Sequence, residues 1–168
     1  HLRNRRQRQM CIRDRPCGLV SVMGGKWTTC RPMANDTLRA VATQLGRPLD
    51  APQPLPLLGS AASPAETLQR LREQAIELKD LLPDGAMRDQ QIAHLQSNHG
   101  LQALPLITGI DPVQREPLSG VIPLCQGEID HAIQREHARS ASDVLARRCR
   151  MAMVDLKEAR RLQPLVDE

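Results

Sequence analysis

Apolar residues recur at helical spacing once the chain passes residue 63. The first stripe consists of Leu68, Leu71, Ala75, Leu78 and Leu82. Steps of three and four residues place these side chains on one face of a helix. Ser63-Pro-Ala-Glu66 is a capping box with proline at the first helical position, so the helix should begin there and end at Pro83-Asp-Gly85.

The rest of this region also follows a helical pattern. Further helices are predicted over 86–98, 101–107, 128–139, from Ser140 or Ser142 to Met153, and over 155–162. Gly100 should end the first of these helices, and Pro164 should interrupt the last. Segment 108–123 is predicted as a loop because it holds three prolines and two glycines. Residues 63–168 therefore read as an all-α domain of four or five helices, with Arg147, Arg148 and Arg150 on a solvated or ion-paired face.

The pattern before residue 47 is different. Leu19–Met23 has the β-branched residues of a short strand, Gly24 and Gly25 permit a tight turn, and a helix should run from about Thr28 until Gly46 stops it. The backbone N–H groups of such a turn and the helix dipole favour an anion. A phosphate-binding P-loop is excluded, because Val20 stands where its first glycine is required and Trp27 follows Lys26. An ordinary turn with a solvated lysine remains the alternative.

A linker separates these two regions. Residues 47–62 hold four prolines, which forbid a regular helix. The chain therefore divides into a tail over 1–16, a strand–turn–helix over 17–46, the linker over 47–62 and the helical domain over 63–168. The fold class is mainly α, with a strand–turn–helix before the helical domain.

The positive charge of the chain lies in its tail. Residues 1–16 carry six arginines and one aspartate, whereas the whole chain has a net charge of +4. A nucleic-acid or lipid-binding arm is disfavoured, because the tail has no apolar periodicity and no interleaved aromatic residues. Its Met-Cys-Ile-Arg-Asp-Arg core resembles translated sequencing-adapter sequence, so we interpret 1–16 as foreign, with a surface tail as the alternative. We expect no nucleic-acid partner.

Cysteine and histidine spacing gives no metal site. The five cysteines include no Cys-x-x-Cys pair, which argues against both a zinc site and a disulfide scaffold and favours a cytoplasmic protein. Glu128-x-x-His131 matches half of a di-iron motif, but no second copy is present. The histidines are interpreted as surface or capping residues.

Three segments together resemble the FAD-dependent glycerol-3-phosphate dehydrogenases. Ser21–Thr37 matches that family's Gly-Gly-Lys-x-Thr-Thr-Tyr-Arg turn, and His94-Leu-Gln-Ser-Asn-His-Gly100 matches its His-Leu-x-x-x-Tyr-Gly element. An acidic helix from Glu128 and the following Asp143-Val-Leu-Ala-Arg-Arg-Cys-Arg150 resemble its C-terminal helical domain. Cys30, His99 and His131 stand at positions where the family carries tyrosine, and this chain contains no Tyr and no Phe.

The resemblance implies oxidation of sn-glycerol 3-phosphate to dihydroxyacetone phosphate by bound FAD, with electrons passed to membrane quinone. It implies that the strand–turn–helix over 17–46 is the C-terminal remnant of an α/β FAD-binding domain, and that the flavin lies against Gly24, Gly25, Lys26, Trp27 and Thr28. Lys26 is the candidate catalytic residue beside flavin and substrate, and Arg31 is a weaker candidate. The resemblance also implies peripheral association with the inner face of the cell membrane and leaves room for a homo-oligomer.

The chain lacks the dinucleotide-binding fingerprint and the substrate-pocket strands of that family. We therefore expect this polypeptide alone neither to retain FAD nor to turn over substrate. Two alternatives stay open: a glycerol-3-phosphate oxidase of the same family, and a free-standing helical interaction module.

Overall fold

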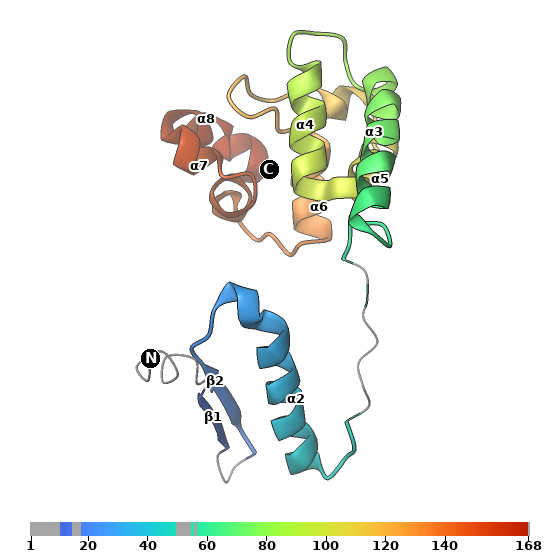
Figure 1. The fold of residues 1–168 in the computed structure, drawn as a ribbon. Coiled ribbons are helices and arrows are strands. Elements are labelled where there is room, and N and C mark those ends of the chain that lie inside the picture. Colours follow the sequence, from blue (N-terminus) through green and yellow to red (C-terminus); the bar gives the residue numbers. More distant parts are fainter. Residues whose placement is uncertain (1–10, 15–17, 50–54, 56, 168) are drawn as a thin grey trace, which may run out of the picture. The chain divides into compact units, whose positions relative to one another are not determined.

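The computed structural model describes residues 11–14, 18–49, 55 and 57–167, and the chain forms two units, 1–54 and 55–168 (Figure 1). Within these ranges helices dominate, which confirms the mainly α fold class. The predicted tail and linker lie partly outside the described residues, which omit 1–10, 15–17, 50–54 and 56.

The first unit is the predicted strand–turn–helix with one additional strand. Strand β2 (Val20–Met23) leads through the glycine turn into a short 3₁₀ turn, η1 (Trp27–Thr29), and then helix α2 (Cys30–Leu45). Gly46 ends α2 in a left-handed conformation with φ 60°, as its position predicted. Strand β1 (Cys11–Asp14) pairs antiparallel with β2, Cys11 opposite Met23 and Asp14 opposite Val20. The sequence analysis gave no element there, and the foreign origin of 1–16 stays a prediction.

This unit does not bury its apolar side chains among its described residues. None of the residues 18–49 is buried, and Trp27 is 90% exposed. A strand and an amphipathic helix normally bury their apolar faces against a further layer. Residues 18–49 thus carry apolar faces that they do not bury among themselves.

The second unit begins with helices α3 (Pro64–Leu81) and α4 (Arg88–His99), followed by η2 (Gly100–Gln102) and α5 (Ala103–Thr108). The predicted cap of α3 is confirmed, since the Ser63 hydroxyl accepts the N–H of Glu66 at 3.2 Å. These elements share one core cluster: Leu78, Leu82, Ile92, Leu95, Ala103, Ile107 and Cys125.

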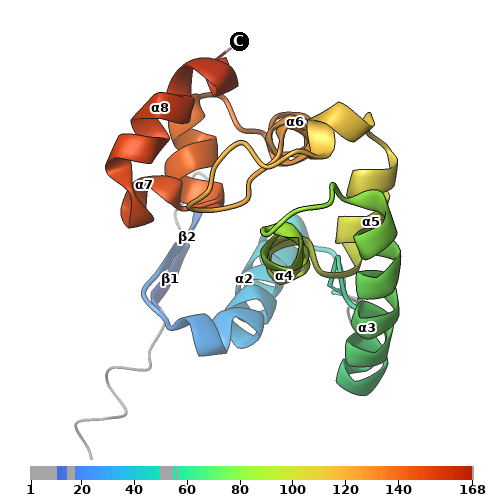
Figure 2. The ribbon, with the colours of Figure 1, turned by 90° about the horizontal axis from the view of Figure 1, so that it is seen from above.

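The remaining elements build a second core. They are η3 (Pro112–Arg115), α6 (Gln126–Gln134), the π-helical turn η4 (Asp143–Arg148), α7 (Met151–Val154) and α8 (Leu156–Asp167). Helix α6 connects the two cores, because Cys125 before it packs in the first and Ile129 within it packs in the second. Figure 2 shows α7 and α8 side by side at one end of this unit, with α3, α4 and α5 at the other.

Two predicted helix ends in this region are wrong. The helix predicted to reach residue 139 ends at Gln134, and the one predicted to reach Met153 breaks where Arg150 adopts φ 58°. That break shifts the helical phase, so Met151 is buried while Met153 is 76% exposed.

Pro164 does not interrupt the last helix. Helix α8 continues through it to Asp167, although an interior proline removes a backbone hydrogen bond and crowds the preceding turn. Buried Leu162 and Val166 hold the last turn on the core, and the Asp167 carboxylate accepts the N–H of Ala141 at 3.1 Å. Tertiary contacts therefore outweigh the local signal.

Gly59 and Gly100 meet backbone to backbone where the linker joins the helical unit. Gly100 has φ 56°, and the N–H of Leu101 donates to the Gly59 carbonyl at 2.9 Å. A Cβ on Gly100 would collide with that carbonyl oxygen. We expect Gly100→Ala to lower the free energy of unfolding by about 2–3 kcal/mol. Gly85→Ala, where a Cβ meets open space, should change it by less than about 0.5 kcal/mol in the same urea titration. Equal values for the two variants would contradict this packing.

Within the ranges that the structure describes, no helix is both long and apolar enough to cross a membrane.

Candidate functional site

The glycine turn has the backbone geometry that the sequence predicted. Gly24 and Gly25 have φ values of 86° and 102°, which side chains with a Cβ rarely adopt. A Cβ on Gly24 would point into open space, and one on Gly25 would collide with the side chain of Met33. Side chains are thus excluded from both positions, and the backbone over Gly24 is open for the close approach of a ligand.

The residues after the glycines are accessible. Thr29 fixes the turn, because its hydroxyl accepts the N–H of Lys26 at 3.2 Å and donates to the Lys26 carbonyl at 2.9 Å. Lys26, Trp27 and Thr28 are exposed, and so is Arg31 in the first turn of α2. The structure therefore brings together the five residues predicted to contact a cofactor, and their role stays a prediction.

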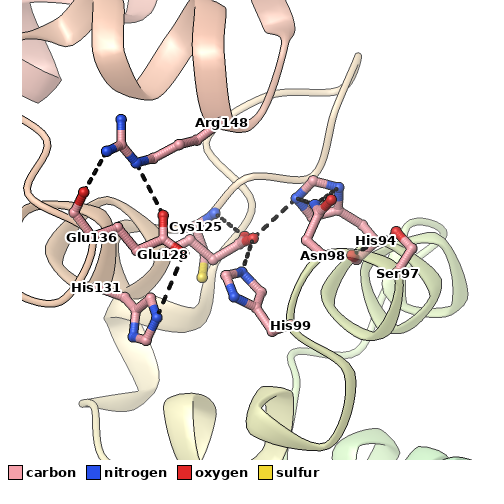
Figure 3. A network of polar contacts seen from close by, with 9 residues as sticks. All are labelled: His94, Ser97, Asn98, His99, Cys125, Glu128, His131, Glu136 and Arg148. Atoms are coloured by element: carbon pink, nitrogen blue, oxygen red, sulfur yellow. Dashed lines mark hydrogen bonds and ion pairs between the residues drawn. The ribbon is translucent and has the colours of Figure 1, made fainter. Parts of the chain in front are cut away.

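A second polar site, which the sequence analysis missed, lies in the helical unit. Glu128 in α6 has a side chain only 4% exposed, and one of its oxygens, Oε1, lies 3.0 Å from His94 Nε2 and 3.1 Å from His99 Nε2. Its other oxygen accepts the backbone N–H of Cys125 at 3.2 Å, which caps α6. Figure 3 shows the carboxylate held between the two imidazoles of α4 and the start of α6.

These hydrogen bonds decide the ionisation of Glu128. Burial alone raises the pKa of a carboxyl group, but hydrogen bonds from His94 and His99 outweigh burial and lower the pKa of Glu128 to about 2. Both oxygens are engaged, so this carboxylate is held as an ionised structural group. The buried Cys125 thiol beside it has a pKa raised to about 12, mainly by burial, and is therefore not a reactive thiolate at neutral pH.

Acid should weaken the folded state through Glu128. A carboxyl group whose pKa falls on folding, here from 4.5 to about 2, stabilises the protein above pH 4.5 and loses that contribution as pH falls toward 2. We expect about 2–3 kcal/mol less free energy of unfolding at pH 2.5 than at pH 5 from this group, measured by urea titration. Glu128→Gln should remove most of this pH dependence, and an unchanged dependence in that variant would contradict the assignment.

A more exposed layer of polar residues continues beyond Glu128. Glu136 Oε2 lies 3.0 Å from Arg148 Nε, and Arg147 pairs with Asp143 at 2.6 Å. This confirms the prediction of an ion-paired face for Arg147 and Arg148. The rings of His99 and His131 pack edge to face with centroids 5.4 Å apart, beside a hollow of about 540 Å³ that Glu136 also lines.

The interpretation of the histidines as surface or capping residues is wrong for His94 and His99, whose side chains are each only 12% exposed. They lie 34 and 29 residues before Glu128, so no local spacing reveals the contact. The His94–Gly100 element and Glu128-x-x-His131 each stand out in the sequence, but nothing in the sequence joins the two.

The fold defines a class of protein: a helical domain with a buried, hydrogen-bonded carboxylate, preceded in the chain by a strand, a glycine turn and a helix. Residues 52–168 match the family model described as the C-terminal domain of alpha-glycerophosphate oxidase. The chain belongs to this family.

The curated relatives carry the name of one enzyme. The mitochondrial glycerol-3-phosphate dehydrogenase of Arabidopsis thaliana is 33% identical over 162 residues, covering 89% of this chain and 25% of the relative. The probable enzyme of Caenorhabditis elegans is 30% identical over 88% of this chain, and the human enzyme 26% over 90%, each with 20% of the relative covered. The chain thus spans a fifth to a quarter of these relatives. No solved structure matches it significantly.

Proposed function

We propose that this chain is the C-terminal part of an FAD-dependent glycerol-3-phosphate dehydrogenase that oxidises sn-glycerol 3-phosphate to dihydroxyacetone phosphate and passes the electrons to quinone. One observation carries the proposal: the similarity to the Arabidopsis enzyme covers 89% of the chain, more than residues 52–168 alone could supply. It must therefore extend into the unit that holds the glycine turn.

The turn fits a flavin at its edge. Gly24 and Gly25 leave backbone exposed where a side chain would block a planar ring, and Lys26 is accessible at the mouth of the turn. Bound FAD would supply the acceptor for the hydride of the substrate. The turn N–H groups and the positive end of α2 would stabilise negative charge placed over them, because both are fixed before the charge develops. The accessible Lys26 ammonium would add a full positive charge there.

The helical unit has a supporting role in this proposal. Its buried carboxylate has both oxygens occupied, and the Cys125 thiol has a raised pKa, so neither group is prepared for acid–base or nucleophilic chemistry. We assign the chemistry to the turn, together with the residues of the whole enzyme that bind flavin and substrate. We assign structural support to residues 63–168.

The isolated chain should contain no flavin, since residues 18–49 of its first unit bury none of their side chains. Purified chain mixed with excess FAD and desalted is expected to show flavin absorbance well below one equivalent. A stoichiometric yellow protein would show that the chain alone forms the cofactor site.

Activity is testable in a chimaera in which residues 18–168 replace the matching segment of the Arabidopsis relative. We expect this chimaera to oxidise sn-glycerol 3-phosphate with a soluble quinone analogue. The matching family model is named after an oxidase, which makes oxygen the second candidate acceptor. If oxygen alone supports peroxide formation as fast as the quinone analogue supports substrate oxidation, the oxidase is favoured. If substrate oxidation requires the quinone analogue, the dehydrogenase is favoured.

The proposal includes peripheral attachment of the whole enzyme to the inner face of the cell membrane. Quinone is dissolved in the lipid bilayer of that membrane. Membrane fractions of the source cells should hold the enzyme and release it in a carbonate wash.

A further inference from the structure

Three metal-ligating side chains converge at the hollow beside Glu128. His99 comes from the end of α4, His131 from α6 and Glu136 from the segment just after α6. One ligand atom of each lies within 4.8 Å of those of the other two. Ligands of a tetrahedral zinc ion lie roughly 3.4 Å apart, given bonds of about 2.0–2.2 Å. Side-chain movements of about 1.5 Å would therefore close the three groups around an ion.

His99 is already oriented as metal-binding histidines are. Its Nε2 lies 3.1 Å from the buried Glu128 carboxylate, which can only accept a hydrogen bond. Nε2 is thereby engaged with Glu128, which leaves Nδ1 as the ring nitrogen for a metal. A carboxylate that holds the far nitrogen of a histidine in this way fixes the ring and raises the basicity of the ligating nitrogen.

The other two groups also have a ligand atom to offer. Arg148 engages Oε2 of Glu136, while Oε1 of Glu136 lies 4.0 Å from Nε2 of His131. The ring of His131 packs edge to face against the ring of His99 and lines the same hollow, so its nitrogens lie within reach of the other two groups. Two carboxylates, Glu136 and Glu128, lie close to two guanidinium groups, Arg148 and Arg135. Their negative charges offset the positive charges, so the site does not repel a cation.

We propose that His99, His131 and Glu136 form a binding site for a divalent transition metal of the Zn²⁺ type. Two imidazoles and one carboxylate suit Zn²⁺, and the fourth position would face the hollow of about 540 Å³, open to water or a small anionic ligand. The site is independent of the proposed flavin chemistry, because all of its residues lie in the helical unit. Sequence spacing gave no such site because the ligands come from separate segments.

The test measures Zn²⁺ affinity by competition with a chromophoric chelator at pH 7.4. The protein is the full 168-residue chain with Cys11, Cys17 and Cys30 changed to serine, so that these three thiols do not compete for the metal. We expect one Zn²⁺ per chain, and a loss of affinity of at least roughly tenfold in both His131→Gln and Glu136→Gln. Co²⁺ in place of Zn²⁺ should give visible d–d absorption without a thiolate charge-transfer band.

His137→Asn is the matched control. His137 is exposed, lies next to Glu136 and has φ 57°, a conformation that asparagine tolerates. It should bind Zn²⁺ as the parent does. Equal affinity in the parent, His131→Gln and Glu136→Gln would overturn the site, as would the same loss in all three single variants. Circular dichroism of each variant distinguishes lost metal ligation from lost folding. A variant whose spectrum equals that of the parent is folded, so its change in Zn²⁺ affinity reports on ligation, and two such ligand variants are compared.

Discussion

Glu128→Ala is expected to lower the free energy of unfolding by about 3–5 kcal/mol, the usual cost of breaking a buried charged network by removing one partner. The truncation leaves three donors without their acceptor: the ring N–H groups of His94 and His99 and the backbone N–H of Cys125. It also removes the cap of α6, the helix that connects the two cores of the helical unit.

Urea unfolding followed by circular dichroism measures this loss. Glu77→Ala is the matched control, because Glu77 is an exposed glutamate of α3 and its truncation should change the free energy by less than about 0.5 kcal/mol. A loss below about 1 kcal/mol for Glu128→Ala would mean that the buried contacts contribute little to folding.

Lys26→Ala in the Arabidopsis chimaera should lower kcat/KM for sn-glycerol 3-phosphate by roughly 10²–10³-fold, the range found when one fixed group that stabilises developing negative charge is removed. Lys26 is the charged residue of the exposed turn, held by the hydrogen bonds between its backbone and Thr29. Lys26→Arg should recover part of the activity because it restores the charge.

Arg31→Ala is the comparison for Lys26. Arg31 is also exposed and lies one helical turn further on, so a general loss of positive charge near the turn would affect both variants. We expect less than about a fivefold change for Arg31→Ala. Similar losses for the two variants, or an unchanged rate for Lys26→Ala with full flavin content, would remove Lys26 from the site.

Features that depend on one or two neighbouring residues could be predicted from the sequence. The cap at Ser63, the left-handed stop at Gly46 and the positive φ values of Gly24 and Gly25 are each determined by one or two residues, and each is confirmed. The order of strand, glycine turn and helix could therefore be predicted from the sequence, whereas the 3₁₀ turn over Trp27–Thr29 was not.

Features that depend on contacts distant in sequence were not predictable in this way. Pro164 stays within α8 because Leu162 and Val166 are buried against the core, and Arg150 breaks a helix that its neighbours favour. The contacts of Glu128 with α4 bridge 29 and 34 residues, and the convergence of His99 with His131 depends on how α4 meets α6. The fold class could be predicted from sequence alone, whereas the polar site of the helical unit required the structure.

Anaerobic mixing of the flavin-loaded chimaera with sn-glycerol 3-phosphate is the most direct test of the central claim, that this chain completes a glycerol-3-phosphate dehydrogenase. The account predicts that the substrate bleaches the flavin absorbance of the chimaera stoichiometrically, and that Lys26→Ala slows the bleaching. A folded chimaera that loads FAD but is not bleached by the substrate would contradict the account.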